Sequence, residues 1–306
     1  MHVAVVIVGY RNPGDIVQCL AALAASTYSD FAVVICENGG PTAYDTLARA
    51  IPPALPGGQT VRAFAAPRNL GYAGGVNAAM AAAAHADLWW VLNPDTQARS
   101  GAMAALVARM AAGDCDAAGG TLLRADGSVQ SWGGRWRPWL ARAVSIGFGQ
   151  SAAACPAASV IEARQNYLSG ASMMVGRRFL ATVGPMREDY FLYCEEVEWC
   201  LRAGAAGLTL GFAPDATVVH DHGATTGSGA AVRDQPRLPI YLGERNKMLL
   251  TRDRFPARLP VAAAAALAIL IVRYGRRGAW RQAGHGIAGW WAGLRDRRGV
   301  PGWWGL

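Results

Sequence analysis

The stretch Leu88-Trp89-Trp90-Val91-Leu92-Asn93-Pro94-Asp95-Thr96 decides the fold of this 306-residue chain. Five consecutive apolar residues that are stopped by a proline predict a buried strand ending in a turn. Pro94 has no N–H to donate and biases Asn93 away from helix. The pattern therefore places Asp95 at the carboxyl end of a core strand, where open α/β sheets bind their ligands. An Asx-type turn without a ligand also explains the tetrapeptide, so the rest of the chain must decide.

The first hundred residues alternate between strand and helix patterns. The predicted strands are residues 3–9, Phe31–Cys36, Val61–Ala65 and 88–92, and the predicted helices are Asp15–Ala25, Tyr44–Ile51 and Asn77–Ala84. Strands that are apolar throughout, with helices between them, predict a mostly parallel, Rossmann-like α/β sheet that is covered by helices on both faces.

Beyond residue 100 the patterns are less uniform. Residues 101–118 are Ala-rich and helical in pattern, and residues 119–165 are interpreted as a variable lid or acceptor-side segment. Regular patterning returns at Ala171–Val175, and a short strand, Thr217–Val219, ends at His220.

Basic residues are concentrated at the C-terminal end of the chain, whose net formal charge is +8. Residues 231–306 hold 14 Lys and Arg against 4 Asp and Glu, whereas residues 1–230 hold 15 against 17. We therefore predict an α/β domain at residues 1–228 and a basic, Trp-rich helical region at residues 229–306.

The C-terminal region interleaves arginine with tryptophan, which is typical of a helix at a membrane surface. Its apolar segment, residues 260–272, is shorter than the roughly twenty residues that span a membrane, so we predict that it packs in a core or lies at the interface. We expect peripheral contact with an anionic membrane surface; a basic helix that packs on its own domain is the alternative. The basic residues form no nucleic-acid-binding motif, and no nucleic-acid partner is expected.

Cysteine usage and the N-terminal sequence predict a cytoplasmic protein. The six cysteines are scattered and form no C-x-x-C pair, which argues against a zinc site or a disulfide framework. The chain opens directly into the apolar run 3–8, without a basic segment, and this run is too short for a signal peptide.

The first candidate ligand-binding segment is Asn69-Leu70-Gly71-Tyr72-Ala73-Gly74-Gly75-Val76-Asn77, before a predicted helix. Its glycines allow the backbone to approach a ligand closely, and the following helix N-terminus favours anions. No Gly-Lys-Ser/Thr follows, so this is not a Walker loop. An ordinary loop is the alternative.

The second candidate is Tyr190-Phe191-Leu192-Tyr193-Cys194-Glu195-Glu196-Val197-Glu198-Trp199-Cys200-Leu201-Arg202. On a helix, Glu195 and Glu198 share one face, Glu196 points elsewhere, and Glu198 can pair with Arg202. A carboxylate in an aromatic-walled site has a raised pKa, which suits a general base. A capped helix with internal salt bridges is the alternative.

Three residues are candidates for holding a cation. Asn93 and Asp95 can both offer oxygen to one hard divalent cation. His220 at a strand end can ligate a metal or cap a turn. His222 would point to the opposite face of an extended chain, so we do not expect both histidines to bind one metal.

The order of these motifs resembles an inverting glycosyltransferase of family two, and more narrowly its rhamnosyltransferase-like branch. The resemblance covers residues 3–225 and rests on Val6–Asn12, Cys36–Gly39, Asn69–Asn77, Asn93–Asp95, Gly184–Arg202 and His220. Residues 243–250 (Gly-Glu-Arg-Asn-Lys-Met-Leu-Leu) and 293–296 (Gly-Leu-Arg-Asp) also resemble that branch.

The resemblance implies a GT-A fold, a nucleoside diphosphate sugar donor with dTDP-rhamnose favoured, Mg²⁺ or Mn²⁺, and a glycan or lipid-linked acceptor of the cell envelope. It assigns the donor to Tyr10, Glu37, Asn69, Gly71, Gly74, Asn77 and Asn93, the metal to Asp95 and His220, and the general base to Glu196. Glu37 and Glu196 stand where the family usually has Asp, and Asn93 replaces the first Asp of its Asp-x-Asp motif. The choice of base among Glu195, Glu196 and Glu198 therefore stays open.

Two other functions fit parts of the sequence. A nucleotidyltransferase usually has a Gly-rich loop with a basic residue right after its first strand, and Gly9-Tyr10-Arg11-Asn12 fits this poorly. A catalytically inactive GT-A scaffold or lipid-surface accessory protein fits the departures at Asn93 and Glu196.

Overall fold

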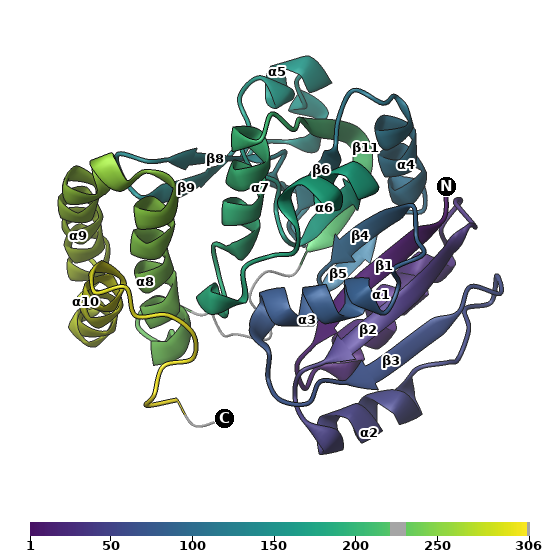
Figure 1. Ribbon diagram of the computed structural model, residues 1–306, viewed down its shortest axis with the longest axis horizontal. Helices are drawn as coiled ribbons and strands as arrows, with labels where there is room; N and C mark the ends of the chain where they lie inside the picture. The colour runs from purple at the N-terminus through teal and green to yellow at the C-terminus, as the bar shows by residue number, and fades with distance from the viewer. Residues whose placement is uncertain (221–230, 305–306) are drawn as a thin grey trace.

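The computed structural model describes residues 1–220 and 231–304 and consists of a central sheet, helices on both of its faces, and three C-terminal helices beside it (Figure 1). The strands are β1 Val3–Gly9, β2 Phe31–Glu37, β3 Val61–Ala65, β4 Leu88–Leu92, β5 Thr96–Ala98, β6 Ala117–Leu123, β7 Val129–Ser131, β8 Gly134–Arg137, β9 Arg142–Ser145, β10 Ser172–Gly176 and β11 Leu210–His220. The α-helices are α1 Pro13–Ala24, α2 Pro41–Ala50, α3 Gly71–Ala81, α4 Ala102–Ala111, α5 Ala158–Glu162, α6 Arg177–Val183, α7 Glu195–Ala205, α8 Arg237–Arg254, α9 Leu259–Gly275 and α10 Trp280–Leu294. Short 3₁₀ turns are η1 Ala152–Ala154, η2 Glu188–Tyr190 and η3 Pro256–Arg258.

The large sheet has the strand order β3-β2-β1-β4-β10-β6-β11-β5, with β7 paired to β6. Strands β1 to β4 pair in parallel, as do β6 and β11. Strand β10 is antiparallel to both of its neighbours, and β5 is antiparallel to β11. The predicted mostly parallel α/β sheet is therefore confirmed, with antiparallel strands inserted in its second half.

The apolar strands are continuous runs because the sheet is buried on both faces. In β1, Val3, Val5 and Ile7 face a core that contains side chains of α1, α2 and α4. The alternate residues Ala4, Val6 and Val8 face a second core with side chains of α3, α6 and α7. Successive side chains of a strand point to opposite faces, so neither position tolerates a polar residue.

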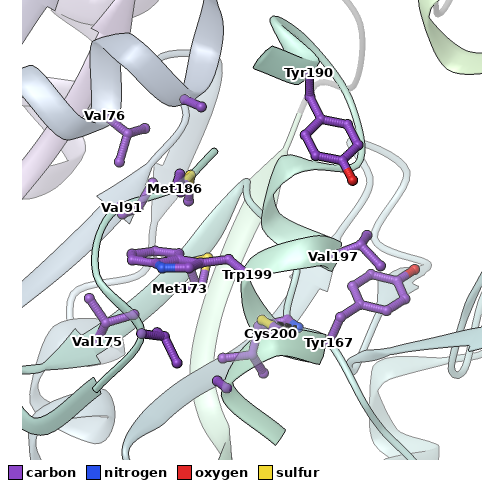
Figure 2. Close-up of a cluster of buried hydrophobic side chains, with 14 of the residues drawn as sticks. Val76, Val91, Tyr167, Met173, Val175, Met186, Tyr190, Val197, Trp199 and Cys200 are labelled. Atoms are coloured by element: carbon purple, nitrogen blue, oxygen red, sulfur yellow. Dashed lines mark hydrogen bonds between the residues drawn. The ribbon is translucent and has the colours of Figure 1, made fainter. Parts of the chain in front are cut away.

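The second core fixes the position of α7, whose first residues are the acidic block. Figure 2 shows Val197, Trp199 and Cys200 of α7 in the same cluster as Met173 and Val175 of β10. The Trp199 ring also packs edge-to-face on Phe179, with ring centroids 4.8 Å apart. The apolar side of α7 therefore anchors the helix in the second core. The orientation of its N-terminus depends on other contacts.

Helix α3 begins at Gly71, six residues earlier than predicted. Gly71 has φ +74°, and a Cβ at this position would lie 2.2 Å from the carbonyl oxygen of Phe191. The next residue, Tyr72, donates its N–H to that oxygen at 2.8 Å. The glycines thus lie in the first turns of the helix, where they permit close approach of another chain segment, and not in a loop before it.

The predicted helix over residues 101–118 ends at Ala111, and the strand β6 starts at Ala117. Gly113, with φ +78°, ends the helix. An Ala-rich pattern does not distinguish a helix from a fully buried strand, and in β6 Gly120 lets the carbonyl of Ala216 approach.

The segment 119–165, predicted to be irregular, contains β7, the hairpin β8–β9 and the short helix α5. Trp132 and Trp136 in it are buried. Its interpretation as a lid or acceptor-side segment stays a prediction.

The three C-terminal helices pack on the α/β part. Met248, Leu249 and Leu250 of α8 belong to the same buried cluster as the strands. The predicted boundary between residues 228 and 229, like Asp221 and His222, lies outside the described residues. The apolar helix is longer than the thirteen-residue segment predicted: Pro256–Gly275 is long and apolar enough to cross a membrane by length and composition alone, with 28% of its 18-residue apolar window buried.

Candidate active site

The sheet brings several predicted site residues to one edge. Strands β1, β2 and β4 lie side by side and parallel, so that Tyr10, Glu37 and Asn93 stand at or directly after their carboxyl ends. On the far side, His220 at the end of β11 pairs with Thr96 of β5, next to Asp95. The turn at Asn93–Asp95 therefore connects β4, beside β1, to β5, beside β11.

Asp95, His220 and Asn93 form one cluster. The His220 Nε2 atom lies 3.3 Å from Asp95 Oδ1 and 3.4 Å from Asn93 Nδ2. Both His220 and Asp95 are largely buried. The predicted association of Asp95 with His220 is thus present in the fold, although 125 residues of chain separate them.

The orientation of the His220 ring follows from its second nitrogen. His220 Nδ1 lies 3.0 Å from Oε1 of Gln130. An amide oxygen only accepts, so Nδ1 is the ring nitrogen that donates to Gln130, and Nε2 is the nitrogen that faces Asp95 and Asn93. A neutral imidazole held through its other ring nitrogen is the usual arrangement of a metal-binding histidine.

The cluster fits a divalent cation with two protein ligands. Asp95 offers a carboxylate and His220 an imidazole, a donor pair that suits Mn²⁺ or Mg²⁺ when a diphosphate supplies further oxygens. Among the described residues, no three or more His, Cys, Asp and Glu side chains converge on one point. Asn93 turns its Nδ2 toward His220, so we infer a neutral supporting role for it and not direct ligation.

Tyr72, on α3, connects this cluster to the acidic helix. Its hydroxyl oxygen lies 3.0 Å from Asn93 Oδ1 and 2.7 Å from the carbonyl oxygen of Gly170, and both of these oxygens can accept its hydrogen. Burial raises the pKa of Tyr72 well above its ordinary value, and the charges of Glu195, Glu196 and Asp95 raise it further. The tyrosine thus stays protonated and can donate its hydroxyl hydrogen to Asn93 or Gly170.

The three glutamates of α7 occupy different environments, and the predicted pair of Glu198 with Arg202 is present. Glu198 is fully buried and pairs with Arg202 at 3.1 Å and with Arg254 at 3.6 Å. Glu196 is half-buried, and its Cβ and Cγ face Gly170 beside the Tyr72 ring. Burial raises the pKa of Glu196. Of the three, Glu196 has both an open side and a site-facing position.

Glu195 is buried and, unlike Glu198, makes no ion pair with an arginine among the described residues. Its side chain is 2% exposed, and its Oε2 atom has no hydrogen-bond partner among the described residues. Burial and the neighbouring charge of Glu196 raise the pKa of Glu195 from 4.5 to about 8.

The donor-side residues form a second group beside the first. Glu37 is fully buried, and its Oε1 accepts from the N–H of Arg11 at 3.1 Å and of Gly39 at 2.7 Å. Asn69 Oδ1 accepts from the N–H of Gly71 at 2.9 Å. Tyr10 is half-buried, with the Arg11 guanidinium 5.3 Å above its ring. Their nucleotide-binding roles stay predictions.

Two predicted donor residues have contacts of another kind. Asn77 donates from Nδ2 to the carbonyl of Met186 and to Glu188, and its Oδ1 accepts from the N–H of Met186. This amide joins α3 to the turn that precedes the acidic helix. Gly74 faces Leu70 and Glu188. The structure therefore places neither Asn77 nor Gly74 in the cluster around Tyr72.

Sequence reasoning missed three residues of the site. Tyr72 lies inside the Gly-rich motif Asn69–Asn77, but only the glycines and asparagines of that motif were assigned roles. Asn38, directly after β2, hydrogen-bonds both Gly71 and Leu70. Gln130 lies in the segment with no regular pattern. Only the register of β6, β7 and β11 brings Gln130 to His220, and the sequence does not contain this information.

A sheet edge of this topology, with an Asx-Pro-Asp turn, a strand-end histidine and an acidic helix, agrees with the GT-A fold that the resemblance implies. The chain belongs to glycosyl transferase family 2, whose model matches residues 4–165.

Its relatives agree with this family. The chain is 29% identical, over 252 residues (74% of this chain and 78% of the relative), to the N-acetylglucosaminyl-diphospho-decaprenol L-rhamnosyltransferase of Mycobacterium tuberculosis. Among solved structures it resembles the mannosyltransferase PcManGT from Pyrobaculum calidifontis in complex with GDP-Man and Mn²⁺, with a TM-score of 0.55, 14% identity and coverage of 97% of this chain and 88% of the other. GalNAc-T7 with UDP, GalNAc and Mn²⁺ also has a TM-score of 0.55, at 14% identity, over 81% of this chain and 51% of the other. The chain is thus a rhamnosyltransferase-like member of the family with a GT-A fold.

The raised pKa of Glu195 predicts a pH-dependent stability. Because the folded-state pKa of about 8 exceeds the ordinary 4.5, the contribution of Glu195 to stability is fully present below pH 4.5 and is lost as the pH rises through 8. We expect Glu195→Gln to raise the melting temperature at pH 8.5 relative to the wild type, by roughly 2–4 °C for each kcal/mol recovered, and to leave it unchanged near pH 4.5.

Thermal melts in EDTA across this pH range measure the effect. Asp45→Asn, an exposed carboxylate on α2, is the matched control and should follow the wild-type curve. A Glu195→Gln variant whose difference from the wild type is the same at both pH values would contradict the assignment.

Proposed function

We propose that this protein transfers a sugar, with rhamnose favoured, from a nucleoside diphosphate sugar to an acceptor hydroxyl, with inversion at the anomeric carbon. The observation that carries the proposal is the position of the Tyr72 hydroxyl, which donates toward Asn93 and the Gly170 carbonyl at the carboxyl edge of the sheet. Asn93 and Asp95 both contact His220, and Gly170 faces Glu196, so one tyrosine connects the proposed cation site to the candidate base.

Glu196 is the proposed general base. Its half-buried position lets an acceptor approach, and its raised pKa makes it a stronger proton acceptor than an exposed carboxylate. As the acceptor oxygen bonds to the anomeric carbon, its proton passes to Glu196 and the bond from that carbon to the diphosphate oxygen breaks. Attack from the face opposite the leaving group inverts the configuration.

Asp95 and His220 are the proposed ligands of a divalent cation, with Gln130 holding the imidazole. Such a cation supplies positive charge to the departing diphosphate. The Mn²⁺ in the two similar solved structures supports this requirement. Asn93 keeps its amide between Tyr72 and His220, which fixes the orientation of both side chains.

The relative from Mycobacterium tuberculosis supports the choice of substrates. Its name describes an L-rhamnosyltransferase that acts on a diphospho-decaprenol-linked sugar. By analogy we propose dTDP-rhamnose as the donor and a lipid-linked or glycan acceptor of the cell envelope, with the protein in the cytoplasm at the inner face of the membrane.

The C-terminal helices supply a surface for that location. On α9, Val261 and Val272 are each 55% exposed, while Ala262 and Ala266 of the same helix are buried. Trp280 at the start of α10 is 65% exposed. Exposed apolar and tryptophan side chains next to a strongly basic chain segment match an interfacial helix, which combines apolar burial with attraction to anionic lipids.

Glu196→Gln tests the base. We expect kcat for dTDP-rhamnose turnover with Mn²⁺ to fall by roughly 10²–10⁴-fold, because proton transfer in the transition state is lost, while dTDP binding stays unchanged. Asp45→Asn, an exposed carboxylate on α2, is the control. Near wild-type turnover by Glu196→Gln would refute the assignment. A wild-type protein that releases no dTDP under these conditions would favour the inactive scaffold.

Asp95→Ala tests the cation site. Since Asp95 is one of only two proposed protein ligands, the gain in dTDP affinity on adding Mn²⁺ should disappear, a loss at least as large as the roughly 10–100-fold that second-shell changes cause. Calorimetric titration of dTDP with and without MnCl₂ measures it. Asp126→Ala, in an exposed turn, should retain the full Mn²⁺ effect. Unchanged Mn²⁺-dependent affinity in Asp95→Ala would exclude the role.

Sedimentation with vesicles tests the membrane surface. The wild type should pellet with phosphatidylglycerol vesicles at low salt, and less at high salt, because counterions screen the attraction. The double change Val261→Asn with Val272→Asn should reduce pelleting several-fold. Val160→Asn, which removes an apolar side chain that is 46% exposed on α5, should not. Protein that stays in the supernatant at low salt would contradict the proposed location.

A further inference from the structure

The segment Tyr190–Cys194, which leads into the acidic helix α7, has an unusual backbone. Phe191, Tyr193 and Cys194 have φ of 68°, 76° and 70°, in the left-handed region that side chains with a Cβ disfavour. No glycine occurs in this Tyr-Phe-Leu-Tyr-Cys sequence. Such a conformation persists only where surrounding contacts impose it, and such segments cluster at functional sites.

The contacts that impose it come from Asn246 on α8. Its Nδ2 atom donates to the carbonyl oxygens of Tyr190 at 3.0 Å, Leu192 at 2.7 Å and Tyr193 at 2.9 Å. One amide group therefore contacts three carbonyls of this four-residue stretch, those of residues 190, 192 and 193. Asn246 is fully buried, so water does not compete for these bonds.

Arg245 fixes the amide in that orientation. Its Nε donates to Asn246 Oδ1 at 2.8 Å, which leaves Nδ2 to face the segment. Its Nη2 donates to the Tyr190 carbonyl at 2.8 Å, and its Nη1 donates to the Gly299 carbonyl. Each of the three guanidinium nitrogens thus donates one hydrogen bond, two of them to backbone carbonyls of distant chain segments.

The burial of Arg245 indicates more than a contribution to packing. Its side chain is 1% exposed, and among the residues described here it makes no ion pair with a carboxylate. Burial lowers its pKa to about 10, so it is still charged at neutral pH. A buried charge without a counter-ion is costly, so the three hydrogen bonds of Arg245 must offset that cost.

The clamped segment contacts the site at two points. The carbonyl of Phe191 accepts the N–H of Tyr72 at 2.8 Å. Cys194 is followed directly by Glu195 and Glu196, the first two residues of α7. The path of residues 190–194 therefore sets where Tyr72 and the first carboxylates of α7 lie.

We propose that Arg245 and Asn246 are positioning residues, which hold residues 190–194 in the left-handed conformation that presents Glu196 beside Tyr72. This inference rests on the proposed function of Glu196. It gives a role to the Gly-Glu-Arg-Asn motif of residues 243–246, which lies outside the strands and helices of the site itself.

Asn246→Asp tests the proposal, because it keeps the side-chain shape but replaces the donor of three hydrogen bonds with an acceptor. With dTDP-rhamnose and Mn²⁺ we expect kcat to fall roughly 100-fold, the cost of a displacement of about 1 Å in a catalytic group, while KM for the donor changes by less than about threefold. In hydrogen exchange, the amides of residues 190–199 should exchange faster and those of β1 and β4 should not.

Thr251→Val is the matched control. Thr251 is also fully buried on α8, and its hydroxyl bonds only the Lys247 carbonyl in its own helix among the described residues. It should lower the melting temperature but leave kcat within twofold and exchange of residues 190–199 unchanged. If Asn246→Asp does not fold, Arg245→Lys is measured in its place, and a several-fold loss of kcat at constant KM is expected.

Two outcomes would overturn the proposal: kcat within twofold of the wild type, or loss of kcat only to the extent seen in Thr251→Val. Hydrogen exchange separates this failure from failure of the proposed function. If Glu196→Gln is inactive but Asn246→Asp exchanges like the wild type, only the clamp is wrong. If the wild type has no turnover, the function is wrong, and the exchange of residues 190–199 in Asn246→Asp still decides whether the clamp exists.

Discussion

The geometry of the site depends on the hydrogen bonds of the Tyr72 hydroxyl. It bonds Asn93 and the Gly170 carbonyl, and Asn93 in turn contacts His220, whose other nitrogen contacts Gln130. In a buried site, each of these polar groups must keep its partner because an unpaired one is costly. The carboxyl edge of the sheet is therefore held as one network, and Asp95 has a defined position within it.

The C-terminal helices belong to this architecture and are more than an attachment to it. Arg298 pairs with Asp253 at 2.7 Å and with Asp189 at 2.9 Å, and Tyr190 donates to Asp253 at 2.6 Å. These charged contacts lie next to the Arg245–Asn246 contacts with the same segment. Because the helices share a core with the strands, a division of the chain after residue 228 describes composition better than it describes independent folding.

Much of the fold follows from local sequence, but the site does so only in part. Continuous apolar runs predicted β1 to β4, and the turn after β4 predicted where Asp95 lies. The start of α3 was wrong because Gly71 was interpreted as a loop residue, whereas its positive φ accommodates Phe191, which is 120 residues away. Gln130 and Asn246 were out of reach for the same reason: their partners are set by packing of distant segments, and local patterns carry no such information.

The acidic block shows how position divides one chemical group among several tasks. Glu198 is neutralised by two arginines and so acts in packing α7. Glu195 is enclosed and close to Glu196, so the two carboxylates oppose each other's ionisation. Glu196 alone combines a raised pKa with access from the site. Environments that give similar carboxylates different pKa values distinguish the base from its neighbours. A longer Glu at position 196 can serve where Asp is usual, provided that the backbone before it is fixed.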